Sequence, residues 1–595
     1  MTALLVCFIF GPGIIRSGHF RMQRVIFNVG NFDFEIQFRP GAVRALCCTT
    51  GGVATTLGGP SLPAGSNRQK RDGCDAPEGA FLRGLHLDSD PISQYRFASH
   101  FTADERAFRT KCNSPSGTIR WAASPVYTLI CLILEGSDFM SSSAVAFARQ
   151  NHPRFLDELK ALLRIPSVST DPEHKDDCRK AAEALLAELK RIGLENGRLI
   201  EGEGHPLVYA DWLHAAGKPT VLIYGHYDVQ PPDPLDEWLS PPFEPTERNG
   251  NLYARGSADD KGQIWAQVKA LESLLAANGS LPLNVRVLFE GDEEVGGEVI
   301  AQYVASKPAD LKADFALVSD TELFAPGLPT LCVGLRGMIY TELEVRGAKT
   351  DLHSGMYGGA APNPFVSIAH IIAKLKDEQG HILIPGFYDG IIPPSPEELA
   401  AWKSLPFDEE EYRKAEVGSK QLVGEEGYSV LERTWARPTV EVHGIPGGFI
   451  GAGAKTVIPA KATAKISMRL VPGMTPAKAF ELYKSYVEKI APIGVDVEVR
   501  LIHSGDPCLI PVNNRYIQAA TRALHEVWGK DTVFIRSGGS IPIVGDFDHH
   551  LGLPSVMMGF SLPDDSIHAP NEKFNLKNFE LGIESLIRFL EEVGK

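Results

Sequence analysis

The chain has 595 residues, of which 44% are hydrophobic and 22% are charged, and its formal net charge is −15. This is the composition of a folded protein of several domains, and it excludes mostly disordered, collagen-like and coiled-coil chains. The acidic balance argues against nucleic acid or an anionic membrane as a partner, and no apolar run approaches the ~20 residues that cross a bilayer, so we expect a soluble protein.

The first 139 residues differ from the rest of the chain. They contain 14 Arg and Lys and 11 Asp and Glu, a balance of +3, so the remaining residues carry −18. They show no sustained period of 2 or 3.6, and we predict that residues 1–139 are an extension outside the functional fold, with a native start near Met140. A small extra domain and a secretion signal are alternatives, although the first charge, Arg16, follows the apolar run 4–10 instead of preceding it.

Beyond residue 143 the chain alternates between helical and strand patterns. Apolar residues recur at helical spacing over 155–163, 181–192 and 262–277, which predicts amphipathic or buried helices. Four short continuous apolar runs suit strands that are buried on both faces of a largely parallel sheet. We therefore predict an α/β domain. The four runs are 220–224, 285–289, 315–318 and 555–558.

Histidines and carboxylates follow these four runs. In an open parallel sheet, ligands bind beyond the carboxyl ends of the strands. A mixed set of histidines and carboxylates suits divalent Zn, Mn or Co better than Ca. Each His or Asp taken singly is more often a solvated loop residue, but their joint occurrence at strand ends favours a metal site. The residues are His226, Asp228, Glu293, Glu294, Asp320 and His568, with Asp259 on a loop before a helix.

In combination these motifs resemble the M20 metallopeptidase family, in particular its carnosinase-like dipeptidase branch. The resemblance covers about residues 143–595. Residues 1–139 match nothing in the family pattern. The matching segments are 225–231, 255–262, 290–296, 319–320, 351–355, 453–459, 538–542 and 568–572.

The resemblance implies a fold and a domain order. The fold is a mostly parallel-sheet zinc-hydrolase catalytic domain with a smaller inserted α+β lid that also mediates dimerisation. The lid is expected at 334–504, and it would divide the catalytic domain into an N-terminal segment at 143–333 and a C-terminal segment at 505–595.

The resemblance also implies a role for each site residue. His226 and Asp320 would hold one divalent ion and Glu294 and His568 another, with Asp259 bridging the two. Asp228 would orient His226, and Glu293 would be the general base. The residues expected to bind substrate are His353, Thr456, Arg469 and Ser540, with His353 reaching the other subunit of a homodimer.

The expected enzyme is a cytoplasmic dipeptidase. It would use two divalent ions, with Zn the first choice and Mn or Co the alternatives, to cleave dipeptides that have a free C-terminal carboxylate, by means of a metal-bridging hydroxide and Glu293. An N-acyl amino acid deacylase or desuccinylase of the same fold is the nearest alternative. An inactive metal-binding relative is a third, and the intact Glu293 argues against it. From the residues alone, Arg469 would read as a surface strand residue, and His353, Thr456 and Ser540 as loop residues.

Overall fold

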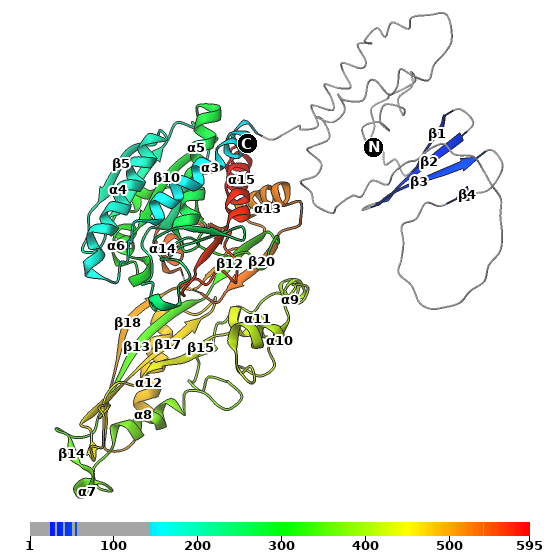
Figure 1. The fold of residues 1–595 in the computed structure, drawn as a ribbon. Coiled ribbons are helices and arrows are strands. Elements are labelled where there is room, and N and C mark those ends of the chain that lie inside the picture. The colour runs from blue at the N-terminus through cyan, green and yellow to red at the C-terminus, as the bar shows by residue number, and fades with distance from the viewer. Residues whose placement is uncertain (1–23, 30–31, 40–41, 50–53, 56–141, 540) are drawn as a thin grey trace, which may run out of the picture. The chain divides into compact units, whose positions relative to one another are not determined.

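The computed structural model describes residues 24–29, 32–39, 42–49, 54–55, 142–539 and 541–595 (Figure 1). The chain divides into two compact units, Met1–Trp121 and Ala122–Lys595, and each is described by itself. Within the described residues, no helix has both the length and the apolar character needed to span a membrane.

The first unit contains a small antiparallel sheet in the strand order β1-β2-β3-β4. The sequence alternates between apolar and polar residues over 32–39, a local period of 2 that coincides with β2. The alternation is confined to runs of at most eight residues within a long aperiodic stretch. That residues 1–139 lie outside the functional fold remains a prediction. The strands are β1 (Arg24–Val29), β2 (Phe32–Arg39), β3 (Ala42–Thr49) and β4 (Ala54–Thr55).

The second unit is built on a nine-stranded mixed sheet. Its main path is β19-β12-β21-β11-β7-β10-β6-β5, and β20 pairs with β12. The four predicted strands are neighbours at its centre, and the pairs β21–β11, β11–β7 and β7–β10 are all parallel, which confirms the α/β prediction. The strands are β5 (Glu195–Ile200), β6 (Leu207–Trp212), β7 (Thr220–His226), β10 (Asn284–Glu290), β11 (Phe315–Val318), β12 (Thr330–Leu335), β19 (Cys508–Leu509), β20 (Val533–Ser537) and β21 (Ser555–Met557).

Helices pack around this sheet, and α5 is the most deeply placed of them. Every residue of α5 from Lys261 to Leu274 is buried, and the helix contacts β7, α3 and α15. Its first turn therefore lies beside the end of β7, where the candidate site forms. The helices around the sheet are α3 (Ser143–Leu163), α4 (Lys175–Arg191), α5 (Lys261–Asn278), α6 (Glu298–Ser306), α13 (Arg515–Trp528), α14 (Pro542–Leu551) and α15 (Leu576–Val593).

A second, antiparallel sheet forms the predicted lid, in the order β15-β17-β13-β18. Alternate residues of β13 are buried, and they join a core of their own with α8 and α12. The predicted boundary at 334 falls inside β12, which belongs to the catalytic sheet. The lid elements are β13 (Gly337–Arg346), α8 (Pro364–Ile372), β15 (Thr439–Gly444), β17 (Lys461–Leu470), α12 (Pro476–Ile490) and β18 (Asp496–Gly505).

One segment of the predicted lid belongs elsewhere. Trp402, Leu431 and Trp435 are buried in the core of the catalytic domain, and the two indole rings meet edge to face at 5.2 Å. The helices α9 (Pro396–Lys403) and α11 (Val430–Trp435) contact β20. Sequence spacing did not reveal this, because the large aromatic side chains that fix the packing lie on short helices inside the inserted segment.

Smaller elements complete the fold. β8, β9 and β22 form a three-stranded sheet, and β14 pairs with β16. Figure 1 shows β14 and α7 at the end of the lid that is remote from the catalytic sheet. The remaining bounds are β8 (Thr246–Arg248), β9 (Asn251–Tyr253), β14 (Leu352–His353), α7 (Ser354–Tyr357), α10 (Glu409–Glu411), β16 (Val457–Ile458) and β22 (Lys573–Asn575).

Candidate metal centre

The candidate site lies where three parallel strands end together. His226 is the last residue of β7, Asp320 follows β11 by two residues, and Glu293 opens the short turn after β10. Strand β7 can pack closely against α5 because residue 225 is glycine. A Cβ atom there would lie 2.1 Å from the Ile264 side chain, a distance that real side chains do not tolerate.

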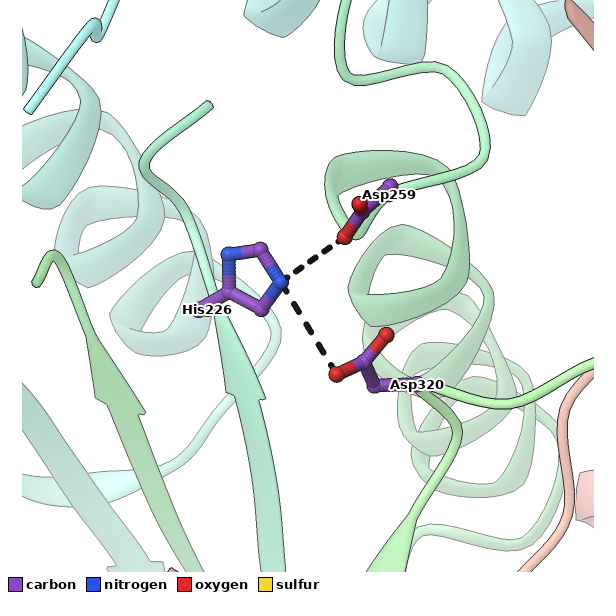
Figure 2. Close-up of side chains that lie close together, drawn as sticks. All are labelled: His226, Asp259 and Asp320. Carbon is purple, nitrogen blue, oxygen red and sulfur yellow. Dashed lines mark hydrogen bonds and ion pairs between the residues drawn. The ribbon is translucent and has the colours of Figure 1, made fainter. Parts of the chain in front are cut away.

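The first donor group consists of His226, Asp259 and Asp320. His226 Nε2 lies 3.0 Å from Asp259 Oδ1 and 3.9 Å from Asp320 Oδ2, and both carboxylates point at the same ring nitrogen (Figure 2). The imidazole is fully buried, so bulk water does not contact that nitrogen.

The second donor group shares Asp259 with the first. His568 Nε2 lies 2.9 Å from Asp259 Oδ2 and 3.2 Å from Glu294 Oε2. Asp259 therefore directs one carboxylate oxygen to each histidine. Within each group the ligand atoms lie within 4.8 Å of one another, so the two groups could hold two cations with Asp259 between them.

Asp228 links the first histidine to the glutamate pair. Its Oδ1 lies 3.3 Å from His226 Nδ1, and its backbone oxygen lies 3.1 Å from the same nitrogen. The carboxylate also accepts the backbone N–H of Glu293 at 3.3 Å and that of Glu294 at 3.1 Å. One buried side chain thus fixes both the ring orientation of His226 and the turn that carries the two glutamates.

The electrostatics show an excess of buried negative charge. Burial, assisted by Asp259, raises the pKa of Asp320 to about 7, and burial raises the pKa of Glu293 well above its usual range. Hydrogen bonds that the protonated imidazole donates to Asp259 and Glu294 raise the pKa of His568 to about 10. The raised pKa values of these carboxylates and of His568 show that acidic and imidazole groups are crowded together in a buried place, and a divalent cation bound among them would favour the ionised carboxylates and the neutral imidazole.

Two further observations fit a divalent cation. Glu294 Oε1 is buried and has no hydrogen-bond partner among the described residues, whereas its Oε2 accepts a hydrogen bond from Gln230 at 2.7 Å. Such an orphaned carboxylate oxygen is costly unless something binds it. The donor set of imidazoles and carboxylates suits Zn, Mn or Co.

A third acidic cluster does not have this character. Glu158, Glu188 and Glu272 lie close together, but the fully buried ammonium of Lys269 sits among them. Its Nζ is 2.6 Å from Glu158 Oε2 and 2.9 Å from Glu272 Oε2, and it also contacts Glu188. The lysine already supplies the positive charge, so we assign no metal there.

The structure places the predicted substrate residues in several locations. His353 and Thr456 are both exposed and adjacent, since β14 and β16 pair and Ser354 N donates to Thr456 O at 3.0 Å, but they lie at the remote end of the lid. Arg469 is half-buried on β17, where burial lowers its pKa, and it does not line the pocket beside the metal groups. Ser540 lies outside the described residues.

A pocket of ≈ 370 Å³ opens on the two donor groups. Its lining includes Asp259, Glu293, Asp320 and His568, and the rest of its wall is formed largely by apolar side chains. Among its described lining residues, Glu322 is the one charged side chain outside the predicted catalytic set. Sequence patterns did not single out Glu322, although it lies two residues after Asp320 on the same loop. The apolar wall comprises Cys332, Leu335, Ile535, Ile541 and Ile567.

Comparisons with known proteins indicate the family of this chain. The family model described as "Peptidase family M20/M25/M40" matches residues 222–592. The chain belongs to this family. The resemblance drawn from the motifs is therefore confirmed, and the chain is a hydrolase that acts on peptide bonds.

Three relatives show how far the similarity extends. The Cys-Gly metallodipeptidase DUG1 of Candida albicans is 34% identical over 74% of this chain and 95% of its own length. The Beta-Ala-His dipeptidase of Rattus norvegicus is 33% identical over 69% and 85% of the two chains. The solved M20 family metallo-carboxypeptidase Sso-CP2 of Sulfolobus solfataricus is 34% identical, covers 74% of this chain and 99% of its own, and superposes with a TM-score of 0.68. These M20 relatives support a metal-dependent dipeptidase activity.

Proposed function

We propose that this M20 peptidase is a dinuclear dipeptidase in which Asp259 bridges two divalent ions. The observation that carries the proposal is the sharing of one carboxylate by two histidine-containing donor groups, with His226 on one oxygen and His568 on the other. Asp320 completes the first group and Glu294 the second. Zinc suits this donor set, with manganese or cobalt as alternatives.

The chemistry divides between the ions and the protein. When bound, the two ions lower the pKa of water and polarise the scissile carbonyl. Glu293 lines the pocket but belongs to neither donor group, so we assign it the transfer of a proton from the attacking water to the leaving amine. A positioned general base of this kind is worth roughly 10²–10⁴-fold in rate. Asp228 keeps the Glu293 backbone and the His226 ring in place.

Glu322 supports a substrate with a free amino group. Its carboxyl group lies on a wall that is otherwise apolar apart from the hydroxyls of Thr321, Ser537 and Ser561, and burial raises its pKa to about 7. A substrate ammonium group would pair with this carboxylate, whereas the neutral amide of an N-acyl amino acid would not. The apolar wall would accommodate an uncharged side chain of the first residue. This arrangement favours dipeptides over the deacylase alternative.

The remaining assignments rest on the family resemblance. His353 would act on a neighbouring subunit of a homodimer, which agrees with its place on β14 at the end of the lid remote from the catalytic sheet (Figure 1), and Thr456 would bind substrate or the developing oxyanion. Arg469 and Ser540 would bind the substrate carboxylate or the developing oxyanion. The three described cysteines, Cys178, Cys332 and Cys508, are free and buried, which suits the cytoplasmic location that we propose.

The test combines metal analysis with a substrate panel. The purified chain is stripped with a chelator and reloaded with Zn²⁺, Mn²⁺ or Co²⁺, and each form is assayed on dipeptides, on longer peptides with a free carboxylate and on N-acyl amino acids. We expect two ions per chain and hydrolysis of dipeptides that the chelator abolishes. A preference for N-acyl amino acids would assign the deacylase function, and one ion per chain would refute the dinuclear site.

A further inference from the structure

We propose that the buried pair Arg255–Glu572 is a positioning device that holds Asp259 and His568 at their mutual distance and so sets the affinity of the second metal position. The inference rests on the proposed dinuclear function. Neither residue belongs to a donor group, and neither lines the pocket. Their role follows from the loops that they join.

Glu572 organises the loop that carries Asp259. Its Oε1 accepts the backbone N–H groups of Ala258 at 2.9 Å and of Asp259 itself at 3.1 Å. Its Oε2 accepts the Gly256 N–H at 2.8 Å and a guanidinium N–H of Arg255 at 2.7 Å. All four neighbours of the carboxylate are donors, and three of them are backbone groups of the loop that ends in Asp259.

Arg255 extends the same network to the loop that carries His568. Its Nη2 donates to the backbone oxygen of Ala569 at 3.3 Å and to that of Pro231 at 3.2 Å. His568 has a φ of 63°, which is unfavourable for a residue with a Cβ atom. Such a conformation persists only where the surroundings over-determine it. The contact of Arg255 with the carbonyl of the next residue, together with Glu572 four residues later, provides that constraint.

The free-energy cost of burying both charges indicates that the Arg255–Glu572 pair positions the loops more than it stabilises the fold. Arg255 is 1% exposed and Glu572 is 0% exposed. A fully buried ion pair gains little net stability over apolar residues of similar size, because both charges lose their hydration. Its directional contacts, however, fix the positions of several backbone groups at once, and outer contacts of this kind typically change metal affinity 10–100-fold.

Glu572→Gln tests the proposal with a substitution of nearly equal size. In either orientation the amide NH₂ of glutamine must face two donors, so one side of the network is lost. We expect the dissociation constant of one Zn²⁺ ion to rise roughly 10–100-fold, measured by competition with a chromophoric chelator. The other ion, which His226 and Asp320 also hold, should be affected less.

The matched control is Glu584→Gln. Glu584 is 4% exposed and accepts two hydrogen bonds from Arg149, at 2.8 and 2.7 Å, between α15 and α3 and outside both donor groups. Both variants should lower the thermal midpoint of the metal-free protein. Only Glu572→Gln should weaken Zn²⁺ binding. Equal and wild-type Zn²⁺ affinities in the two variants would overturn the proposal and leave the pair a purely structural role.

Arg255→Lys covers the case in which Glu572→Gln does not fold. Lysine keeps the charge beside Glu572 but loses the second guanidinium arm, so we expect a several-fold loss of affinity for one ion. Wild-type affinity in this variant would also overturn the proposal. Failure of the dinuclear function itself is distinguishable, because it would appear in the unsubstituted protein as fewer than two bound Zn²⁺ ions.

Discussion

The adjacent residues Glu293 and Glu294 should respond differently to the same isosteric change. Glu294 Oε2 accepts a hydrogen bond from Gln230 and faces His568, whereas its buried Oε1 has no hydrogen-bond partner among the described residues. In Glu294→Gln the amide NH₂ has two possible places. At the Oε1 position it cannot bind a cation, and at the Oε2 position it opposes the Gln230 donor. The first orientation removes an oxygen that is available to a cation, and the second removes the hydrogen bond from Gln230.

The expected magnitude follows from these contacts. Loss of the anionic ligand should weaken binding of the ion at His568 by at least the 10–100-fold that is typical of outer-shell changes, or about 1.4–2.7 kcal/mol. Activity should partly return with excess metal. Glu293→Gln leaves both donor groups intact, so two ions should remain bound while kcat falls roughly 10²–10⁴-fold with little change in KM.

The assay measures bound metal per chain and kcat on the same preparation of each variant. Wild-type protein that has been stripped and reloaded controls for losses during handling. The reasoning is refuted if Glu293→Gln loses an ion while Glu294→Gln retains two, because the base and the ligand would then be exchanged. If both variants retained two ions and the full kcat, neither Glu293 nor Glu294 would have a role in the site.

Three other outcomes are expected. A chain that begins at Met140 should fold and hydrolyse dipeptides at the full-length rate, and loss of bound metal in this chain would show that residues 1–139 belong to the functional fold. Mixed His353→Ala and Glu293→Ala chains, each nearly inactive alone, should regain activity through one working site per heterodimer, whereas no recovery after verified subunit exchange would exclude action in trans. Glu322→Gln should lower kcat/KM for dipeptides roughly 10–100-fold, as expected for loss of a charge-assisted contact of ~1.5–3 kcal/mol, and should leave N-acyl amino acids unaffected; an equal loss on both substrates would refute pairing with the amino group.

Strand ends could be predicted from the sequence because their physics is local. A short apolar run that leads into a histidine or an acidic residue marks both a buried strand and its polar end, and β7, β10 and β11 occur where such runs predict them. β21 also occurs on its predicted apolar run, although His568 follows that run only ten residues later. Helix α3 likewise begins at Ser143, where the aperiodic sequence ends, with its N-cap Ser142 accepting the Val145 N–H at 3.2 Å. Because parallel strands end at one edge, the sequence also indicated which side chains would meet.

The division of roles at that edge was decided by tertiary contacts. The two oxygens of Asp259 face different histidines, and Glu572, more than 300 positions later in the chain, holds the Asp259 backbone. Glycine at position 225 leaves room for the Ile264 side chain of α5 beside the end of β7. Glu322 became a pocket residue through walls contributed by β12 and β20, and Trp402 joined the catalytic core although it lies within the lid insertion. Periodicity reports which face of an element is apolar. Packing decides which distant segment covers that face, and charge compensation decides how a buried carboxylate divides its oxygens between partners. Both arise only when the whole chain has folded.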